Sequence, residues 1–293
     1  MNLVMALEMA AECHPQRIAV SSGGLHLTYS DLLTAARAGA EVIRDAAPRV
    51  RTIDWQSKGP TDFVSEVDLA AEARILALVR RELPEAVVLA EETAADVPLT
   101  RLADGLTVVI DPLDGTTNFL HGYPEYAVSI AVVWKGEPLV AVVYDVPGEE
   151  LFTAVAGGGC LLNGAPCRVS TISDPQRALI GTGFPFKDPA DIAPYQAQMS
   201  RVMAGVSGVR RPGAASIDLA SVACGRFDAF WETILSPWDF AAGMLLVREA
   251  GGLASDVAGR HLSALAPSGV LAGNAAMHAW LRKAVVGDPT LIT

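Results

Sequence analysis

Two aspartates stand three positions apart in the segment 108–119, whose sequence is VVIDPLDGTTNF. The apolar residues before Asp111 predict a buried strand that stops at the aspartates. Asp111 and Asp114 supply carboxylate oxygens, the ligands that a hard divalent cation prefers, and Gly115 with the hydroxyl side chains behind it suits a phosphate. The segment therefore predicts a metal-dependent phosphoryl site.

Two further acidic features occupy similar local settings. Glu91 and Glu92 follow a short apolar strand predicted at 87–90, and Asp239 stands at the start of a predicted helix. Each has an ordinary explanation on its own, because acidic pairs are common in solvated loops and a first-turn acid stabilises a helix by about 1 kcal/mol or less. Considered with the two aspartates, they are carboxylates that distant segments can bring to one site.

The apolar patterns predict the elements that position these residues. Residues 128–133 and 139–144 are typical of an antiparallel meander, and 168–170 should end that sheet. A hairpin is expected at 18–27 around two glycines, with Ser30 as the N-cap of the following helix. The second half alternates strands and helices, which indicates an α/β arrangement. Helices are expected at 30–45, 68–83, 193–203, 216–224 and 239–250, and further strands at 179–182 and 229–231.

Length and composition indicate a globular protein. The chain has 293 residues, of which 51% are hydrophobic and 19% charged, so it can bury the core of one large domain or of two closely packed ones. We expect an N-terminal extension at 1–30, an α+β part with the antiparallel sheet at 31–175, and an α/β part with the last acidic ligand at 176–293.

Charge and cysteine usage exclude several classes of partner. The net charge is −11 and the basic residues form no cluster longer than a pair such as Arg210–Arg211, which argues against a nucleic-acid partner. We find no signal-peptide pattern and no run of 18 apolar residues, and therefore expect a cytoplasmic protein with no membrane partner. Reduced thiols are expected, since no Cys-x-x-Cys pair occurs among Cys13, Cys160, Cys167 and Cys224.

The motifs together resemble those of the inositol monophosphatase family, the lithium-sensitive and magnesium-dependent phosphatases. The resemblance covers roughly residues 33–280 and rests on DPLDGTTN at 111–118, the acidic pair at 91–92, WDFAAG at 238–243 and EAGG at 249–252. It implies a layered αβαβα sandwich of the sugar-phosphatase type, as in fructose-1,6-bisphosphatase, and a homodimer. The implied reaction is hydrolysis of inositol 1-phosphate, a small phosphate ester, to inositol and phosphate.

The resemblance also implies a role for each acidic residue. Two or three Mg²⁺ ions would be bound, with Asp111 bridging two of them, because Mg²⁺ takes few carboxylates and keeps positions for water and phosphate oxygens. The implied metal ligands are Glu91, Asp111, the backbone carbonyl of Leu113, Asp114 and Asp239.

Catalysis would rest on residues around these ions. The hydroxyl of Thr116, oriented by Asp68, would help to activate a water, and Glu92 would orient ligands or waters. Phosphate would meet the amides at the start of a helix, where unpaired N–H groups favour an anion. The implied substrate contacts are Asp114, Gly115, Thr116, the Ala215 amide and Glu232, the last two recognising the alcohol.

Three positions bear on the substrate. Ala90 replaces the glycine usual before the acidic pair, and Ala214 stands where the family commonly has Ser or Thr, which removes a hydroxyl near the alcohol. Thr117 favours inositol phosphates over nucleotide 3′-phosphates or histidinol phosphate, because a lysine often occupies this position in enzymes for those substrates. The alternatives are a phosphatase for fructose 1,6-bisphosphate, 3′-phosphoadenosine 5′-phosphate or histidinol phosphate, and a non-catalytic protein that binds a partner through residues 1–30.

Overall fold

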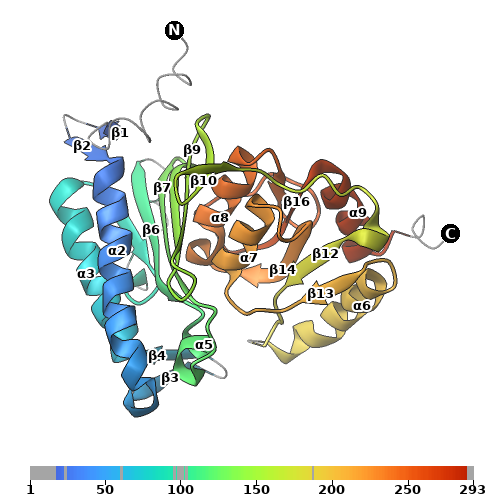
Figure 1. Cartoon of the computed structure of the whole chain (residues 1–293), viewed down its shortest axis with the longest axis horizontal. Coiled ribbons are helices and arrows are strands. Elements are labelled where there is room, and N and C mark those ends of the chain that lie inside the picture. The colour runs from blue at the N-terminus through green and yellow to red at the C-terminus, as the bar shows by residue number, and fades with distance from the viewer. Residues whose placement is uncertain are drawn as a thin grey trace, which may run out of the picture.

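The computed structural model describes residues 18–22, 25–59, 62–94, 97, 102, 105–186 and 188–288. In this part of the chain the elements stack in five layers, in the order helices, sheet, helices, sheet and helices (Figure 1). The αβαβα sandwich expected from the sequence is the observed fold.

Helices α2 (Tyr29–Ala46) and α3 (Glu66–Glu82) form the first layer. They follow β1 (Ile18–Ser22) and β2 (Leu25–Thr28), which pair as the expected hairpin. The prediction of Ser30 as N-cap is wrong, because α2 already begins at Tyr29 and the Thr34 hydroxyl donates to the Ser30 carbonyl (2.6 Å) within the helix. Between α2 and α3 lie η1 (Ala47–Thr52), β3 (Trp55–Gly59) and β4 (Asp62–Ser65).

The first sheet has seven strands in the order β11-β10-β9-β8-β7-β6-β5. Only β5 and β6 pair in parallel; the other neighbours are antiparallel, as the predicted meander requires. The sheet ends at Cys167, so 168–170 lie just beyond it. Its strands are β5 (Val87–Ala90), β6 (Leu106–Asp114), β7 (Ala127–Trp134), β8 (Glu137–Asp145), β9 (Glu150–Val155), β10 (Gly159–Leu162) and β11 (Ala165–Cys167).

The sequence predicts that the apolar strand stops where the aspartates begin, at Asp111. In the structure β6 continues to Asp114. Its pairing with β7 is irregular there: Asp111 is opposite Ser129 and Asp114 is opposite Ala127, so three steps on β6 match two on β7. In a regular strand, residues three apart point to opposite faces. The extra residue removes that alternation, which lets both carboxylates serve one site.

Two helices from the second half of the chain, α7 (Ala215–Ala223) and α8 (Pro237–Glu249), lie between the sheets (Figure 1). Both contact β7 and β8 of the first sheet as well as β16 of the second. Because α7 and α8 belong to the predicted part 176–293 but pack on the sheet of the part 31–175, the two parts share one core.

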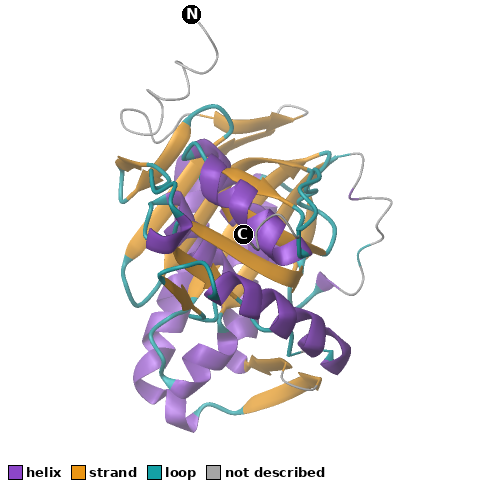
Figure 2. Ribbon diagram, turned by 90° about the vertical axis from the view of Figure 1, so that its right-hand side faces the viewer, coloured by secondary structure: helices purple, strands orange, loops and turns teal. Residues whose placement is uncertain are grey.

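The second sheet has the order β13-β12-β14-β16-β15. Figure 2 looks onto its outer side, which α6 (Ile192–Met203) and α9 (Ala275–Val286) cover. Its strands are β12 (Leu179–Thr182), β13 (Gly208–Arg210), β14 (Ala229–Leu235), β15 (Leu253–Ser255) and β16 (Ser268–Gly273), with short turns η3 (Pro175–Arg177) and η4 (Pro189–Asp191) and the short helix α5 (Thr116–His121) elsewhere. No helix in the described ranges is long and apolar enough to cross a membrane.

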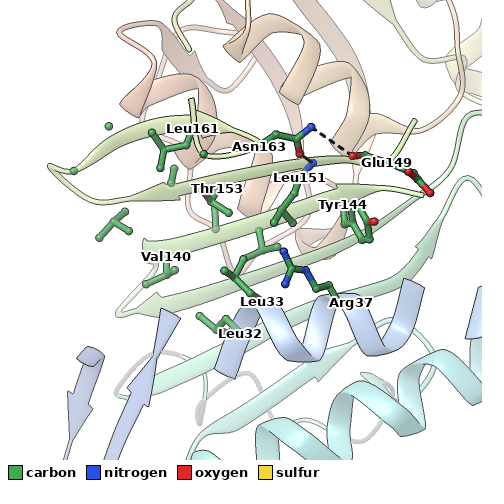
Figure 3. Close-up of a pocket in the computed structure, with 17 residues that line it drawn as sticks. Leu32, Leu33, Arg37, Val140, Tyr144, Glu149, Leu151, Thr153, Leu161 and Asn163 are labelled. Carbon is green, nitrogen blue, oxygen red and sulfur yellow. Dashed lines mark hydrogen bonds between the residues drawn. The ribbon is translucent and has the colours of Figure 1, made fainter. Parts of the chain in front are cut away.

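A groove of about 420 Å³ lies between α2 and the strands β8 to β10 (Figure 3). Leu32 and Leu33 of α2 face Val140 and Leu151 of the sheet across it, and the side-chain oxygen of Asn163, another lining residue, accepts a hydrogen bond from the Leu151 N–H (2.8 Å). None of the predicted site residues lines this groove.

Candidate active site

The parallel pairing of β5 with β6 brings the first two acidic segments together. Ala90 is opposite Ile110, and the next residue, Glu91, donates its N–H to the Ile110 carbonyl (3.1 Å). Glu91 therefore lies beside Asp111 at the same edge of the sheet. Ala90 adopts no positive φ, so the alanine that replaces the family's glycine is accommodated without backbone strain.

Asp111 is the centre of a group of four carboxylates. Its side chain is 1% exposed, and burial raises its pKa well above the ordinary value, with Glu91, Asp114 and Asp239 adding to the rise by their negative charge. Glu91 also hydrogen-bonds the Asp111 carboxyl. Acids this close in a buried place repel one another, and a bound cation would remove that repulsion.

Neighbouring donors hold three of these carboxylates in orientation. Asp111 Oδ1 accepts from the Leu113 N–H (3.0 Å), and Asp239 Oδ2 accepts from the Ser236 N–H (2.7 Å) at the start of α8. Asp114 Oδ2 accepts both the N–H (2.7 Å) and the hydroxyl (2.5 Å) of Ser216 in α7. Such supporting contacts orient ligands before an ion binds.

The donor set fits Mg²⁺. It consists of carboxylate oxygens without Cys or His, which suits a hard cation and not Zn²⁺. Within the described ranges no three His, Cys, Asp or Glu side chains are close enough to hold an ion by themselves. Mg²⁺ does not require such a cage, because it keeps several waters and binds through few carboxylates together with substrate phosphate.

Thr116 and Asp68 lie in contact beside this group. The Thr116 hydroxyl is 2.9 Å from Asp68 Oδ1 and 3.0 Å from the Leu113 carbonyl oxygen. Asp68 is buried, and its other oxygen accepts the N–H (2.8 Å) and hydroxyl (2.5 Å) of Ser65 in the capping box of α3. The helix cap thus fixes the carboxylate that orients the Thr116 hydroxyl.

Glu92 is positioned by a buried acid that was not among the predicted site residues. The N–H of Glu92 donates to Glu72 Oε2 (2.9 Å), and Glu72 is 2% exposed on α3. Glu72 lies one helical turn after Asp68 on the buried face of α3. Two acids at i and i+4 in an apolar stripe are the signal that could have revealed it.

The chain between β6 and α5 requires a glycine. Gly115 has φ of +90°, and a Cβ there would lie 2.7 Å from the Glu125 carbonyl oxygen. From α5, the Asn118 amide donates to the carbonyls of Glu125 (2.8 Å) and Pro212 (3.0 Å). These bonds connect the predicted phosphate-binding turn to the loop before α7.

The cleft consists of two adjoining cavities. One, of about 400 Å³, is lined by Gly115, Thr116 and Asn118, and the other, of about 190 Å³, by Asp114 and Asp239. The Arg211 guanidinium lies 5.3 Å and 5.2 Å from the ring centres of Phe184 and Phe186, which also line the larger cavity. The residues that line both cavities are Arg211, Gly213, Glu232 and Ile234.

The predicted alcohol contacts lie in this cleft. Glu232 faces both cavities, and Ala214 and Ala215 line the smaller one. The Ala215 amide already donates to the Asp114 carboxylate, so a substrate hydroxyl would have to compete for it. Ser216 and Asp218 were not among the predicted site residues, because they lie in α7, whose sequence is typical of a buried helix. Arg211 lines both cavities and belongs to the stretch 211–215, which resembles the family's alcohol-contacting segment.

Asp218 is a buried acid in the lining of the smaller cavity. It is 1% exposed, and its Oδ1 has no hydrogen-bond partner among the described residues. Burial raises the pKa of Asp218 well above its ordinary value, and the charges of Glu232, Asp114 and Glu125 raise it further. The loss of solvation is therefore not compensated by local donors.

An αβαβα sandwich with clustered carboxylates beside a glycine turn is the arrangement of the sugar-phosphatase class of folds. The chain belongs to the inositol monophosphatase family, whose model matches residues 27–288. Members of this family generally depend on Mg²⁺ and act on small phosphate esters.

Three relatives illustrate the range of the family. The chain is 48% identical to Nus factor SuhB of Pseudomonas aeruginosa over 83% of its own length and 89% of that protein. The structure of the extragenic suppressor protein suhB from Bartonella henselae matches with a TM-score of 0.81 and 37% identity, covering 87% of this chain and 97% of that one. Inositol monophosphatase from Anabaena matches with a TM-score of 0.76 and 35% identity, covering 89% and 95%.

The names of these relatives differ in what they say. One is an inositol monophosphatase, whereas another is a Nus factor. The name Nus factor describes a role other than that of a phosphatase. The comparisons therefore do not support the prediction that this protein has no nucleic-acid partner.

Proposed function

We propose that this protein is a Mg²⁺-dependent phosphomonoesterase whose substrate is inositol 1-phosphate. The observation that carries the proposal is the convergence of Glu91, Asp111, Asp114 and Asp239 on one buried site, beside the paired Asp68 and Thr116. Family membership over residues 27–288 supports the reaction type.

In this proposal Glu91, Asp111, Asp114 and Asp239, with the Leu113 carbonyl, hold two or three Mg²⁺ ions. When bound, these ions supply an activated water and neutralise the charge that develops on the phosphate and leaving oxygens. Three of these carboxylates are already oriented by the Leu113 amide, Ser216 and Ser236, which would support them as ligands.

The Thr116 hydroxyl would position the attacking water. Because the Thr116 hydroxyl donates its hydrogen bond to Asp68, its lone pairs can accept a hydrogen bond from a water molecule. That bond would fix the direction in which the water oxygen points. Asp68 is buried and held by Ser65, so it remains a fixed acceptor. Glu92 would orient ligands or waters from its position above Glu72.

The substrate would bind along the two cavities. The amides of Gly115 and Thr116 would receive phosphate oxygens, and Glu232 and the Ala215 amide would meet hydroxyls of the alcohol. Ala214 brings no hydroxyl to that end, so recognition of the alcohol would fall mainly to Glu232. The homodimer and the cytoplasmic location belong to the same proposal.

Release of inorganic phosphate from a panel of esters tests the proposal. We expect turnover of inositol 1-phosphate with Mg²⁺, none in EDTA, and slower turnover of fructose 1,6-bisphosphate, 3′-phosphoadenosine 5′-phosphate and histidinol phosphate. Faster turnover of one of the last three esters would change the proposed substrate but not the proposed reaction. No phosphate release from any ester would refute the proposal that the protein is a phosphatase.

A second candidate follows from the relatives' name. A protein that is 48% identical to this chain is named as a Nus factor. We infer, as the second candidate, that this chain acts as a Nus factor and that this role does not require phosphatase activity. A strain that lacks the gene separates the two functions when it is complemented with Asp111→Asn. Restoration equal to that by the wild type would favour the non-catalytic role, and failure by a stably expressed variant would favour the phosphatase.

A further inference from the structure

Two cysteines face each other at the edge of the seven-stranded sheet. The strands β10 and β11 form a hairpin around Asn163 and Gly164, which both have positive φ. The register places Cys160 directly opposite Cys167, and their Sγ atoms lie 3.1 Å apart, within hydrogen-bond distance. No disulfide joins the cysteines of the described residues, so both are thiols here.

The geometry of this pair suits a disulfide. Directly opposite residues in an antiparallel pair have Cα atoms about 4.5–5.5 Å apart, which lies within the range of about 4.4–6.8 Å that disulfides span. Closing a bond of about 2.05 Å from a 3.1 Å contact needs only a small side-chain movement. The backbone register would not change.

The two thiols differ in reactivity. Cys160 is 2% exposed and packs in the core between the sheet and α8, whereas Cys167 is half-buried on the edge strand. The hydrogen bond between the two thiols lowers the pKa of Cys167, and the charges of Arg168 and Arg226 lower it further. The same hydrogen bond and burial raise the pKa of Cys160. Cys167 thus ionises first, with Cys160 as its proton-bearing neighbour.

A fixed cation accompanies the pair. Both terminal nitrogens of Arg226 bond the Glu150 carboxylate, and its guanidinium lies 6.0 Å from the ring centre of Phe152. The nearby Cys224 is oriented differently, since its thiol donates to the Ser221 carbonyl (3.6 Å). Cys224 therefore provides a matched control, a third thiol in the same region without a facing partner thiol at hydrogen-bond distance.

We propose that Cys160 and Cys167 form a site of reversible oxidation, at which hydrogen peroxide converts the two thiols into a disulfide. The Cys167 thiolate attacks a peroxide oxygen, the O–O bond breaks, and the departing hydroxide takes a proton to become water, leaving a sulfenic acid on Cys167. The Cys160 sulfur then attacks the Cys167 sulfur, the S–S bond forms, and hydroxide leaves with the Cys160 proton as a second water. A dithiol reductant reverses the change.

Mass spectrometry of the full chain after treatment with hydrogen peroxide tests this inference. We expect the loss of two hydrogen atoms, a crosslinked peptide that joins Cys160 to Cys167, and recovery of both thiols with dithiothreitol. A crosslink to Cys13 or Cys224, or oxidation to sulfinic acid without a crosslink, would overturn the proposal. This mapping uses the wild-type protein and needs no variant.

Variants test the order of the steps. Cys160→Ser should accumulate a sulfenic acid on Cys167 that dimedone traps, because the resolving thiol is missing. In Cys167→Ser, oxidation of Cys160 should be at least about tenfold slower than disulfide formation in the wild type, since the missing Cys167 thiolate is the nucleophile. Cys224→Ser should form the crosslink at the wild-type rate. Loss of the crosslink in Cys224→Ser would contradict the assignment. So would a dimedone adduct on Cys160 of Cys167→Ser that forms as fast as the disulfide forms in the wild type.

Discussion

Ser216→Ala should weaken the site through Asp114. The Ser216 hydroxyl and N–H both donate to Asp114 Oδ2, at 2.5 Å and 2.7 Å, and they join the end of β6 to the first turn of α7. The substitution removes only the hydroxyl, and the N–H remains. A hydrogen bond to a charged group contributes about 1.5–3 kcal/mol, so we expect a loss of that size when Asp114 is ionised.

The same change shifts the titration of Asp114. Burial raises its pKa to about 6, and the hydrogen bonds from Ser216 oppose that rise. Losing about 1.5–3 kcal/mol at about 1.4 kcal/mol per unit raises the pKa by roughly one to two units, to about 7–8.

The sign of the pH dependence follows from this pKa. Because the folded-state pKa lies above the ordinary value of 3.8, the free energy of unfolding falls as pH rises from there through about 6 in the wild type. In the variant the fall continues to about pH 7–8. The difference between the two proteins should therefore be small at pH 5, where Asp114 is protonated in both, and should reach about 1.5–3 kcal/mol at pH 9, where it is ionised in both.

Magnesium binding should change in parallel. At pH 7 a carboxyl with a pKa of about 6 is mostly ionised, whereas one at about 7–8 is half ionised or less. Because a metal ligand must be deprotonated, half-saturation by Mg²⁺ should need about two- to tenfold more ion in the variant, and the difference should vanish by pH 9.

Urea unfolding in EDTA and Mg²⁺ titration at pH 5, 7 and 9 measure both effects. Ser221→Ala is the matched control, because Ser221 lies on the same helix, is also buried, and is not bonded to Asp114. If Ser216→Ala and Ser221→Ala have equal stability and equal Mg²⁺ half-saturation at pH 7, the reasoning about Asp114 is refuted.

Three further substitutions test separate parts of the site. Asp111→Asn should abolish Mg²⁺-dependent phosphate release while the circular dichroism spectrum stays unchanged, and retained turnover would exclude Asp111 as a metal ligand. Thr116→Val keeps the shape but removes the hydroxyl bonded to Asp68, so kcat should fall by about 100-fold or more with little change in KM; an unchanged kcat would contradict this role. Asp218→Asn should stabilise the protein in EDTA at pH 8, by about 1–3 kcal/mol, because stability is lost as pH rises through the raised pKa of the buried acid. Thermal unfolding at pH 4.5 and 8 checks the last prediction, and a lower melting temperature of the variant at pH 8 would refute it.

The sequence predicted the acidic side of the site because local patterns carried it. Apolar runs ending in acids marked β5 and β6, and the carboxyl ends of parallel neighbours share one edge of a sheet. The place where β6 ends was not predictable in this way. Its continuation to Asp114 depends on pairing with Ala127 and on an extra residue in the strand, which only the partner strand determines.

The donors that support the site depend on tertiary context. Ser216 and Asp218 lie in α7, all of which is buried, and nothing in a single helix shows which polar residue meets a partner. Ser216 bonds Asp114 from more than 100 positions away, whereas Asp218 Oδ1 has no partner among the described residues. Residue type alone would have treated them alike. Their opposite surroundings are why removing the hydroxyl of one should destabilise the protein and neutralising the other should stabilise it.

The cysteine pair was within reach of the sequence, although a search for Cys-x-x-Cys misses it. Asn-Gly is a strong signal for a two-residue hairpin turn, and counting outward from Asn163 and Gly164 pairs Leu162 with Ala165 and then Cys160 with Cys167. Whether two cysteines of a hairpin face each other is therefore predicted by their equal distance from the turn between them, and not by a fixed spacing such as Cys-x-x-Cys. What the count cannot supply is the asymmetry, because Arg226 reaches Cys167 from another part of the chain and α8 covers Cys160. That tertiary contribution decides which thiol reacts first, and the dimedone experiment with Cys160→Ser measures it directly.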